Sequence, residues 1–215
     1  MTAIKKAEEE LKQTLREKDV LLKEVHHRVK NNLQVINSLL SLQAQEFPDP
    51  VLREALTESQ NRIRSMAMVH EQLYSAGDLA GIDFGEYISR LAAQLMRLTN
   101  RPGITYHVDT DHVSISIDVA VPCGLIVNEL ISNALKHAFH GRGKGTIQIA
   151  LRRVDGETAE LAVSDDGVGL PPAVDLETAE TMGLTLVTSL TRQVHGTLAV
   201  DRSAGTKFVI LFKLF

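Results

Sequence analysis

Apolar residues recur every three or four positions through the first third of the chain, the spacing of a stripe along one helix face. They fall on two interleaved lines: Leu15, Leu22, Val29 and Ile36, and Ile4, Leu11, Val25 and Leu39. Lys18 and Asn32 fall on the second line, so the seam is imperfect. The pattern predicts one long helix with a coiled-coil-like stripe, ending near "EFPDP" because proline cannot continue a helix.

Apolar residues keep the same alternating spacing of three and four positions from Leu52 through Ile63 to Leu73. This pattern predicts a second helix that ends before Gly77. Two helices joined by a short loop form an antiparallel hairpin. One hairpin buries too little apolar surface to stand alone. We therefore expect residues 1–78 to be a dimerisation domain that pairs with a second copy into a four-helix bundle.

From Gly81 onward, helix and strand patterns alternate. The 3.6-residue period predicts helices over 83–98, 119–139 and 183–194, with Asp83 as a candidate N-cap of the first. Two-residue alternation predicts strands over 104–109, 113–118, 146–154, 158–165, 196–201 and 206–215. This mixture of helices and antiparallel strands predicts a domain of the α+β class over 79–215, a sandwich with helices on one face of a single sheet.

Composition narrows the classes of function. Hydrophobic residues make up 44% of the chain and charged residues 23%, both ordinary for a soluble globular protein. A net charge of −4 argues against a nucleic-acid partner. A single cysteine, Cys123, excludes an internal disulfide framework and a multi-cysteine zinc site. With no apolar run of the ~18 residues that a membrane span needs, we expect no span in this chain, a cytoplasmic location, and an upstream sensor domain absent from the chain.

The helix expected over 119–139 bears a polar stripe as well as an apolar one. Val127, Ile131, Ala134 and Ala138 lie on the face expected to be the core, and Glu129, Asn133, Lys136 and His140 lie on another. The polar stripe brings together a carboxylate, an amide oxygen and an ammonium group. Oxygen ligands suit Mg²⁺ and lysine suits phosphate, although a polar stripe taken alone is usually a solvated surface.

Asp165 ends a strand and points the same way as the apolar Leu161 and Val163. A carboxylate on the core-facing side is costly unless it meets a hydrogen-bond donor. The exocyclic amine of adenine is such a donor. Gly167 and Gly169 follow at once, where the chain can turn tightly against a ligand.

Four other segments bear on the question of a nucleotide site. Asp166 is expected to face solvent in the turn, and Gly183 opens a helix whose N-terminus would attract phosphate. Gly205 and Thr206 begin the last strand, with the Thr206 hydroxyl directed inward. The segment "GRGKGT" lacks the spacing of a P-loop, so we interpret it as the flexible entry to a hairpin.

In this order, "NELISNALKHAF", "DDGVG", "MGLTLV" and "GTKF" resemble the N, G1, G2 and G3 boxes of the GHKL (Bergerat) ATPases, shared by gyrase, Hsp90, sensor histidine kinases and MutL. The resemblance covers Gly81 to Phe215 and implies a Mg²⁺–ATP site in an α/β sandwich. It implies that Asn133 binds Mg²⁺ and that Asp165 reads adenine. By the same resemblance the remaining site residues are Glu129 at the acidic box position, Lys136 and His137 near the phosphates, Gly167, Gly169, Gly183, Leu184 and Gly205 at turns that admit the nucleotide, and Thr206 beside adenine.

The segment "HHRVKNNL" in the first helix resembles the phosphoacceptor hairpin of sensor histidine kinases, in the subclass marked by "HRVKN" and related to the HWE kinases. The chain has no tryptophan, which favours the sister group without one. The resemblance covers Leu21 to Tyr74. It implies that His27, rather than His26, accepts a phosphoryl group from ATP and passes it to a receiver-domain aspartate of a response regulator. On the heptad numbering His27 lies at the exposed f position and His26 at e, beside the seam.

The commonest subclass has a glutamate directly after the phosphoacceptor, proposed to take its proton, and here that position is Arg28. Glu24, one helical turn before His27, or Glu129 would have to serve, and both remain open. One alternative function is a GHKL serine protein kinase of the anti-sigma class, against which the histidine-bearing hairpin argues. A second is a non-catalytic dimeric scaffold, against which the intact Asn133 and Asp165 argue.

Overall fold

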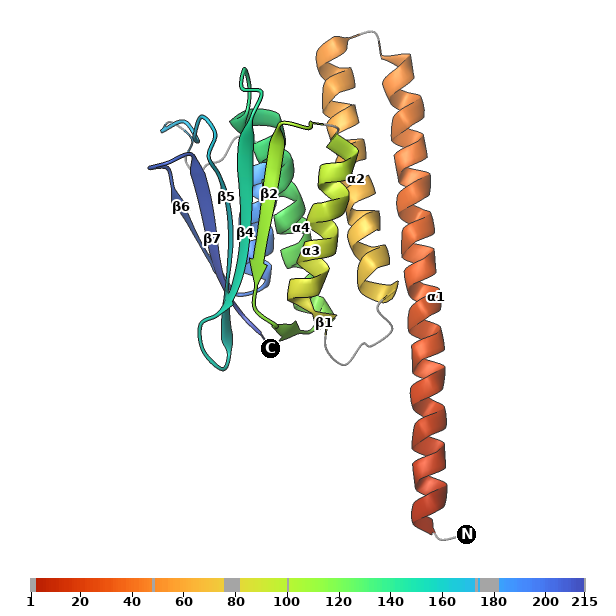
Figure 1. The fold of residues 1–215 in the computed structure, drawn as a ribbon. Helices are drawn as coiled ribbons and strands as arrows, with labels where there is room; N and C mark the ends of the chain where they lie inside the picture. The colour runs from red at the N-terminus through yellow and green to blue at the C-terminus, as the bar shows by residue number, and fades with distance from the viewer. Residues whose placement is uncertain are drawn as a thin grey trace. The chain divides into compact units, whose positions relative to one another are not determined.

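The computed structural model describes residues 3–47, 49–75, 82–99, 101–172, 174 and 182–214. The chain forms two compact units, Met1–Ser75 and Ala76–Phe215, and each is described by itself. The first unit is helical and the second combines helices with a sheet (Figure 1).

The first unit is a hairpin of two helices, α1 (Ala3–Glu46) and α2 (Pro50–Ser75), that pack along each other. The predicted end of α1 near "EFPDP" is confirmed, and Pro50 opens α2, where its missing N–H costs nothing. The predicted start of α2 at Leu52 was two residues late. The turn is held by Arg53, whose backbone N–H donates to the Asp49 carbonyl at 3.0 Å and whose guanidinium donates to the Phe47 carbonyl at 3.1 Å.

The longer helix, α1, leaves many large apolar side chains in solvent. With 44 residues against 26 in α2, and about 1.5 Å of rise per residue, it is roughly 27 Å longer than its partner. Its exposed apolar residues, each between 45% and 66% accessible, are Leu11, Val20, Leu21, Val25, Val35, Ile36, Leu39 and Leu42. The hairpin therefore does not bury the apolar stripe of α1 by itself.

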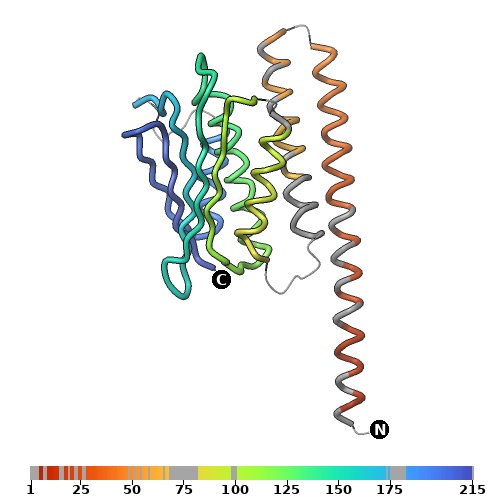
Figure 2. The backbone as a smooth tube through the Cα atoms, viewed as in Figure 1, coloured from red at the N-terminus to blue at the C-terminus, as the bar shows by residue number. Residues whose placement is uncertain are grey.

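The second unit contains a five-stranded sheet in the order β2-β4-β5-β7-β6, whose backbone can be followed in Figure 2. The strands are β2 (Ile104–Thr110), β4 (Gly145–Arg153), β5 (Thr158–Asp165), β6 (Thr197–Asp201) and β7 (Thr206–Lys213). The expectation of antiparallel strands throughout was wrong for β2, which pairs in parallel with β4. The long helical crossover between these two strands allows the parallel pairing.

The strand expected over 113–118 is also shorter than predicted. Only β3 (Ser114–Ile115) is extended, and it pairs with β1 (Ile82–Asp83) instead of joining the main sheet. Ser116 is the N-cap residue of the next helix, and Asp118 lies in that helix's first turn. The Ser116 side chain makes no capping hydrogen bond, so the acidic first turn at Asp118 is the helix-start signal that prevails over the short apolar–polar alternation.

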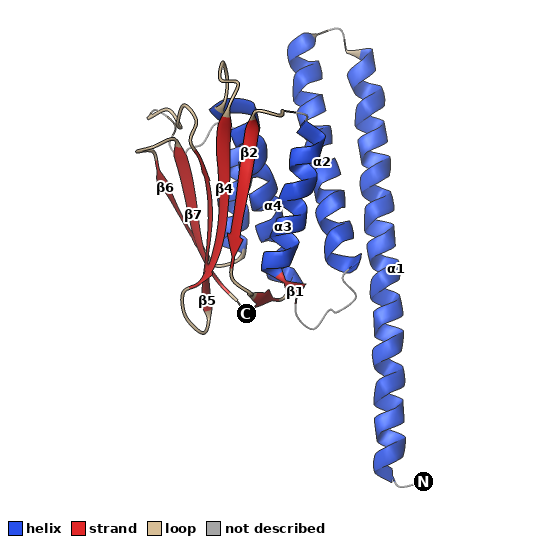
Figure 3. Ribbon diagram, viewed as in Figure 1, coloured by secondary structure: helices blue, strands red, loops and turns tan. Residues whose placement is uncertain are grey.

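Helices cover one face of the sheet, as predicted (Figure 3). They are α3 (Phe84–Thr99), α4 (Ile117–Asn133), the π-helix η1 (Ala134–Ala138) and α5 (Met182–Gln193). The expected core stripe of α4 and η1 is confirmed, since Val127, Ile131, Ala134 and Ala138 are all buried. Asp83 caps α3 as predicted, with its carboxylate accepting from the Glu86 N–H at 3.1 Å.

The central helical segment is unusually apolar. By length and composition alone, Ile117–Ala138 passes as a candidate membrane span, but 67% of its most apolar window is buried inside the structure. It packs against α3 and α5 within the sandwich. Its composition therefore agrees with the position of a core helix between other elements.

Candidate functional site

Asp165, the last residue of β5, lies in register between Ile147 of β4 and Thr206 of β7. Its Oδ1 accepts the Gly167 N–H at 3.0 Å, and both the backbone N–H and the side chain of Thr206 hydrogen-bond to the same carboxylate. Burial raises the pKa of Asp165, and the neighbouring Asp166 carboxylate adds to that rise, while these hydrogen bonds only partly offset it. Asp165 is thus a half-buried acceptor at the edge of the apolar core.

Glycines bring the two loops beside Asp165 together. Gly205 has a positive φ of 86°, and a β-carbon there would overlap the Asp165 carbonyl oxygen. Gly169, with φ of 82°, comes close to Gly205, since its β-carbon would lie 3.3 Å from the Gly205 carbonyl oxygen. Gly167 packs against the end of η1, where a β-carbon would overlap Ala138. The structure places these predicted glycines in one cluster around the end of β5.

The predicted polar stripe does not stay on one helix face. Glu129 is buried, at 5% accessibility, and Asn133 one turn later is half-buried. After Asn133 the chain enters the π-helix, whose wider turn shifts the register. Lys136 and His137 are exposed on that turn, and His140 lies beyond its end. Only Glu129 and Asn133 therefore keep the spacing that the sequence suggested.

The π-helix is held by contacts from outside the helix. The Leu135 carbonyl accepts the Arg101 guanidinium at 2.7 Å, and the Ala138 carbonyl accepts the Val168 N–H at 2.9 Å. The second bond ties η1 to the loop that contains Gly167. The end of this helix and the loop after β5 therefore form one connected structure.

Asp166 is exposed, as predicted, but it is not a simple turn residue. Its Oδ1 accepts the Thr146 N–H at 2.7 Å, and its carbonyl accepts the Arg142 guanidinium at 3.1 Å. It therefore holds the start of β4 beside the loop after β5. The sequence carried no signal for this role.

Gly183 and Leu184 are buried in the first turn of α5. Residues 175–181 of the loop between Gly169 and Gly183 lie outside the described residues. Where the chain before this gap is described, Arg202 holds it, donating to the Val174 carbonyl at 2.6 Å and the Pro172 carbonyl at 3.1 Å. Sequence reasoning missed Arg202, because an arginine in a polar turn resembles any solvated residue.

The two histidines of "HHRVKNNL" lie in the middle of α1, and their side chains are outside the described residues. Next to them, Arg28 Nε donates to Glu24 Oε1 at 2.8 Å, one turn apart on an exposed face. One of the two candidate proton acceptors, Glu24, is therefore already in an ion pair. Glu129, the other, is buried in the sandwich.

The second unit is a sandwich with helices on one face of its sheet. An inward-facing aspartate ends one strand among glycine turns, next to a helix with a buried glutamate and a half-buried asparagine. These features define the ATPase domain of the gyrase, Hsp90 and histidine kinase type. Residues 118–215 match the family model described as histidine kinase-, DNA gyrase B- and HSP90-like ATPase. Residues 24–99 match the model described as histidine kinase, which covers part of α1, all of α2 and α3.

Curated relatives agree with both matches. The chain is 33% identical over 205 residues to the sensor histidine kinase PdtaS of Mycobacterium tuberculosis, which covers 90% of this chain and 39% of that protein. It is 29% identical over 198 residues to blue-light-activated histidine kinase 2 of Erythrobacter litoralis, covering 90% of this chain and 56% of the relative. The chain thus spans between about two fifths and just over half of the length of these relatives.

Solved structures agree with both family matches. The histidine kinase domain of the Erythrobacter litoralis EL346 blue-light-activated kinase aligns with 84% of this chain and 96% of that domain, at a TM-score of 0.67 and 26% identity. The longer EL346 structure aligns with 90% of this chain and 59% of its own, at a TM-score of 0.70 and 28% identity. The chain belongs to the histidine kinases and carries a histidine kinase domain followed by a GHKL ATPase domain.

Proposed function

We propose that this chain is the kinase core of a two-component sensor, which uses ATP to phosphorylate His27 and then transfers the phosphoryl group to a receiver-domain aspartate. The observation that carries the proposal is the environment of Asp165. Its carboxylate is half-buried and accepts hydrogen bonds from Gly167 and Thr206. The same chain carries the histidine-bearing helix α1, earlier in its sequence.

Asp165 has the chemistry of an adenine-recognition residue. Burial disfavours its charge, and a further donor such as the exocyclic amine of adenine would stabilise the carboxylate. Gly205, Gly169 and Gly167 let the loops beside Asp165 pack closely against each other and against the end of η1, which holds the carboxylate in place. The Thr206 hydroxyl, directed into the buried side of the sheet, would lie beside the ring.

Asn133, which lies one helical turn after Glu129, would hold Mg²⁺. Among the described residues no group of three or more His, Cys, Asp or Glu side chains could hold a metal by itself. That fits Mg²⁺ in nucleotide sites, which is commonly held by one or two protein ligands together with phosphate oxygens. When bound, Mg²⁺ would neutralise charge on the phosphates. Lys136 and His137, exposed on η1, and the N-terminus of α5 at Gly183 and Leu184 would face the phosphate groups.

In the kinase step a ring nitrogen of His27 attacks the γ-phosphorus of ATP, so a P–N bond forms while the bond to the leaving ADP oxygen breaks. The imidazole proton passes to a base. Glu24 and Glu129 remain the two candidates, and the Arg28 ion pair orients Glu24, which lies one helical turn before His27. Positioning and charge neutralisation dominate catalysis of this kind.

The active species would be a homodimer. Burial of the exposed apolar side chains of α1 would stabilise the protein. The same stripe on a second copy has the matching length and spacing to pack against them. Residues 1–78 would be this dimerisation and phosphoacceptor domain, and residues 79–215 the catalytic domain. A cytoplasmic location and an upstream sensor domain complete the proposal.

Incubation with γ-labelled ATP and Mg²⁺ tests the proposal and separates it from the alternatives. Phosphohistidine is acid-labile and stable to base, whereas the phosphoserine product of an anti-sigma-class kinase survives acid. We expect acid-labile label that moves onto a receiver domain, and none in Asn133→Ala. Acid-stable label on a second protein would favour the serine kinase, and a chain that neither binds ATP nor becomes labelled would favour the scaffold.

A further inference from the structure

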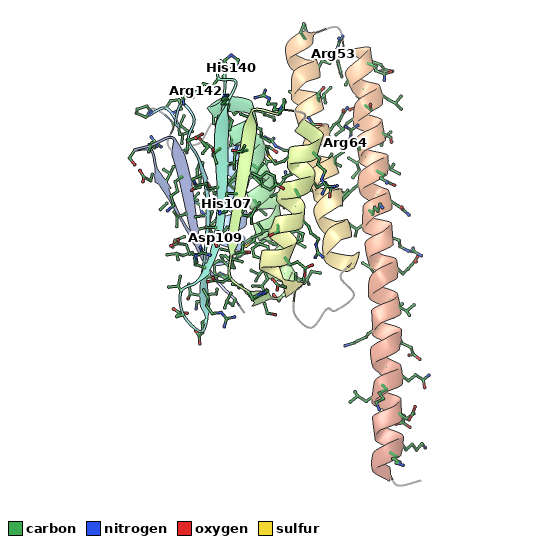
Figure 4. All side chains as sticks on the ribbon, viewed as in Figure 1. Arg53, Arg64, His107, Asp109, His140 and Arg142 are labelled. Atoms are coloured by element: carbon green, nitrogen blue, oxygen red, sulfur yellow. The ribbon has the colours of Figure 1, made fainter. Side chains whose placement is uncertain are left out.

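A pocket lies at the end of the sheet where β2 and β4 begin. Its volume is about 420 Å³, and it is lined by residues 101–104, between α3 and β2, and residues 139–143, between η1 and β4. Among the described residues that line the pocket, Arg101, His140 and Arg142 are basic and none is acidic. Figure 4 shows His140 and Arg142 at the same end of the sheet. In a chain of net charge −4, this is a local concentration of positive charge.

Close backbone packing builds the walls of this pocket. A β-carbon on Gly103 would overlap the Gly143 carbonyl, so the two loops touch where the strands begin. The Gly145 N–H donates to the Gly103 carbonyl at 3.2 Å, directly below that contact. Phe139 is 2% exposed and its ring packs over Gly145, where a β-carbon would overlap it. The loops are therefore held against each other by packing that side chains at Gly103 or Gly145 would prevent.

Both guanidinium groups are oriented by backbone carbonyls. Arg101 donates from Nη1 to the Leu135 carbonyl at 2.7 Å, and Arg142 donates from Nη1 to the Asp166 carbonyl at 3.1 Å. Each guanidinium carries five N–H donors in a planar fork, and each of these bonds uses one nitrogen. A guanidinium already held in place loses less conformational entropy when an anion binds to its other donors.

We propose that this pocket binds a small phosphoryl-bearing anion at a site separate from the nucleotide. The planar forks of Arg101 and Arg142 match the geometry of a phosphate group, which each can bind through two donors. The pocket volume is in the range of small-molecule sites, so the phosphoryl group can carry a substituent. The inference goes beyond the proposed kinase function, because neither Asp165 nor Asn133 lines this pocket.

The two anchoring carbonyls give the pocket a physical connection to the ATPase site. Leu135 belongs to the π-helix that follows Asn133, and Asp166 lies between Asp165 and Gly167. The arginines that would bind the anion therefore also hold the two segments that surround the nucleotide. Binding of a phosphoryl-bearing anion at this site would therefore act on the segments of the kinase domain that surround the nucleotide.

Calorimetric titration of inorganic phosphate into the full chain, at constant ionic strength set with chloride, tests the proposal. The chain is first saturated with Mg²⁺ and a non-hydrolysable ATP analogue, so that the nucleotide's own phosphate positions are filled. We expect one phosphate to bind per chain. We expect Arg101→Gln and Arg142→Gln each to weaken that binding about tenfold or more, whereas the matched control Arg153→Gln, an exposed arginine at the far end of β4, leaves it unchanged.

Asp165→Asn separates the two proposals, because it should lose nucleotide binding and keep phosphate binding. Melting temperatures of all variants identify any loss of fold, and Arg142→Gln stands as the second variant if Arg101→Gln unfolds. No phosphate binding to the wild-type chain, binding that the ATP analogue abolishes, or binding that both arginine variants retain at full strength would each overturn the inference.

Discussion

Gly205 lies against the backbone of Asp165 so closely that a β-carbon at Gly205 would overlap the Asp165 carbonyl oxygen, and its φ of 86° is one that only glycine adopts readily. This contact lets the β7 strand begin directly beside the carboxylate that ends β5. The turn before β7 and the position of Asp165 are therefore one structural feature, and a change at Gly205 must move the carboxylate, the loop or both.

Gly205→Ala should lower the free energy of unfolding by about 2 kcal/mol, from the positive φ together with the steric overlap. It should also weaken ATP binding, because Asp165 is displaced. Chemical denaturation and calorimetry measure the two effects. Gly156→Ala is the matched control, since a β-carbon there meets nothing within 4 Å and its φ is not positive. Equal stability of the two variants would contradict the packing described for Gly205.

Asp165→Asn should abolish tight ATP binding and raise the melting temperature at pH 7. Burial makes the pKa of Asp165 higher in the folded chain than its usual 3.8, so wild-type stability falls as the pH rises from 3.8 through the folded pKa. The neutral amide does not carry that cost, although it keeps an oxygen that can accept the Gly167 N–H. The difference in melting temperature between variant and wild type should shrink as the pH is lowered toward 3.8.

Asp155→Asn is a control for which the expected change in melting temperature has the opposite sign. The backbone N–H groups of Glu157 and Thr158 donate to Asp155 and lower the pKa of its carboxyl, so this charge favours the folded state. Its amide variant should be no more stable than wild type at pH 7. An Asp165→Asn variant that melts below wild type at pH 7 would show that burial does not dominate at that site.

The pair of Asp83 and His112, with His112 Nδ1 2.6 Å from Asp83 Oδ2, should make stability depend on pH near neutrality. The hydrogen bond to Asp83 raises the pKa of His112, and the nearby Asp111 and Glu86 carboxylates act in the same direction. The pair's contribution is therefore complete below pH 6.5 and is lost as the pH rises through the raised pKa of the folded state. His112→Ala should lower the melting temperature at pH 5.5 and leave it unchanged at pH 9.

Asp83→Asn serves as the background that isolates this ion pair. Burial acts to raise the pKa of Asp83, but its bonds to His112 and to backbone N–H groups together lower it, so the carboxylate is charged throughout this range. Asparagine is as good an N-cap as aspartate and removes only the charge. In the Asp83→Asn background, His112→Ala should leave the melting temperature unchanged at either pH. If His112→Ala still lowers the melting temperature at pH 5.5 by as much as in the wild type, the effect belongs to another contact.

Tyr87 is fully buried between α3 and α4, and its hydroxyl has no hydrogen-bond partner among the described residues. An unpaired buried hydroxyl costs free energy, so Tyr87→Phe should raise the free energy of unfolding by about 1 kcal/mol. Tyr106→Phe is the matched control because Tyr106 is 41% exposed, and it should change little. Destabilisation by Tyr87→Phe in denaturant titrations would reveal a partner for the hydroxyl.

Sequence periodicity predicted most elements, because apolar spacing is a local property that reports which face of each element is buried. The helical hairpin, the buried stripe of α4 and the strand that places Asp165 inward all followed from it. It did not predict the parallel pairing of β2 with β4, because pairing direction depends on where a long crossover returns. The strand expected over 113–118 was mostly lost to the helix start at Ser116.

The site was less predictable where distant segments act on one another. The π-helix after Asn133 depends on a carbonyl that accepts from Arg101, 34 positions before it in the chain, and nothing in the local sequence announces that bond. The bonds from Arg142 to Asp166 and from Arg202 to Val174 are equally non-local. The roles of Asn133 and Asp165 rest on the family resemblance, with the structure supplying their surroundings.

The most direct test of the account is to measure acid-labile phosphorylation from γ-labelled ATP in His27→Ala and His26→Ala. Neighbouring residues on a helix point about 100° apart, so an ATP domain poised over one imidazole is poorly aimed at the other. A misplaced nucleophile reacts about 100-fold more slowly. We predict that His27→Ala loses the acid-labile label while His26→Ala keeps part of it, with ATP binding intact in both. Normal labelling of His27→Ala together with loss of label in His26→Ala would contradict the assignment of His27 as the phosphoacceptor.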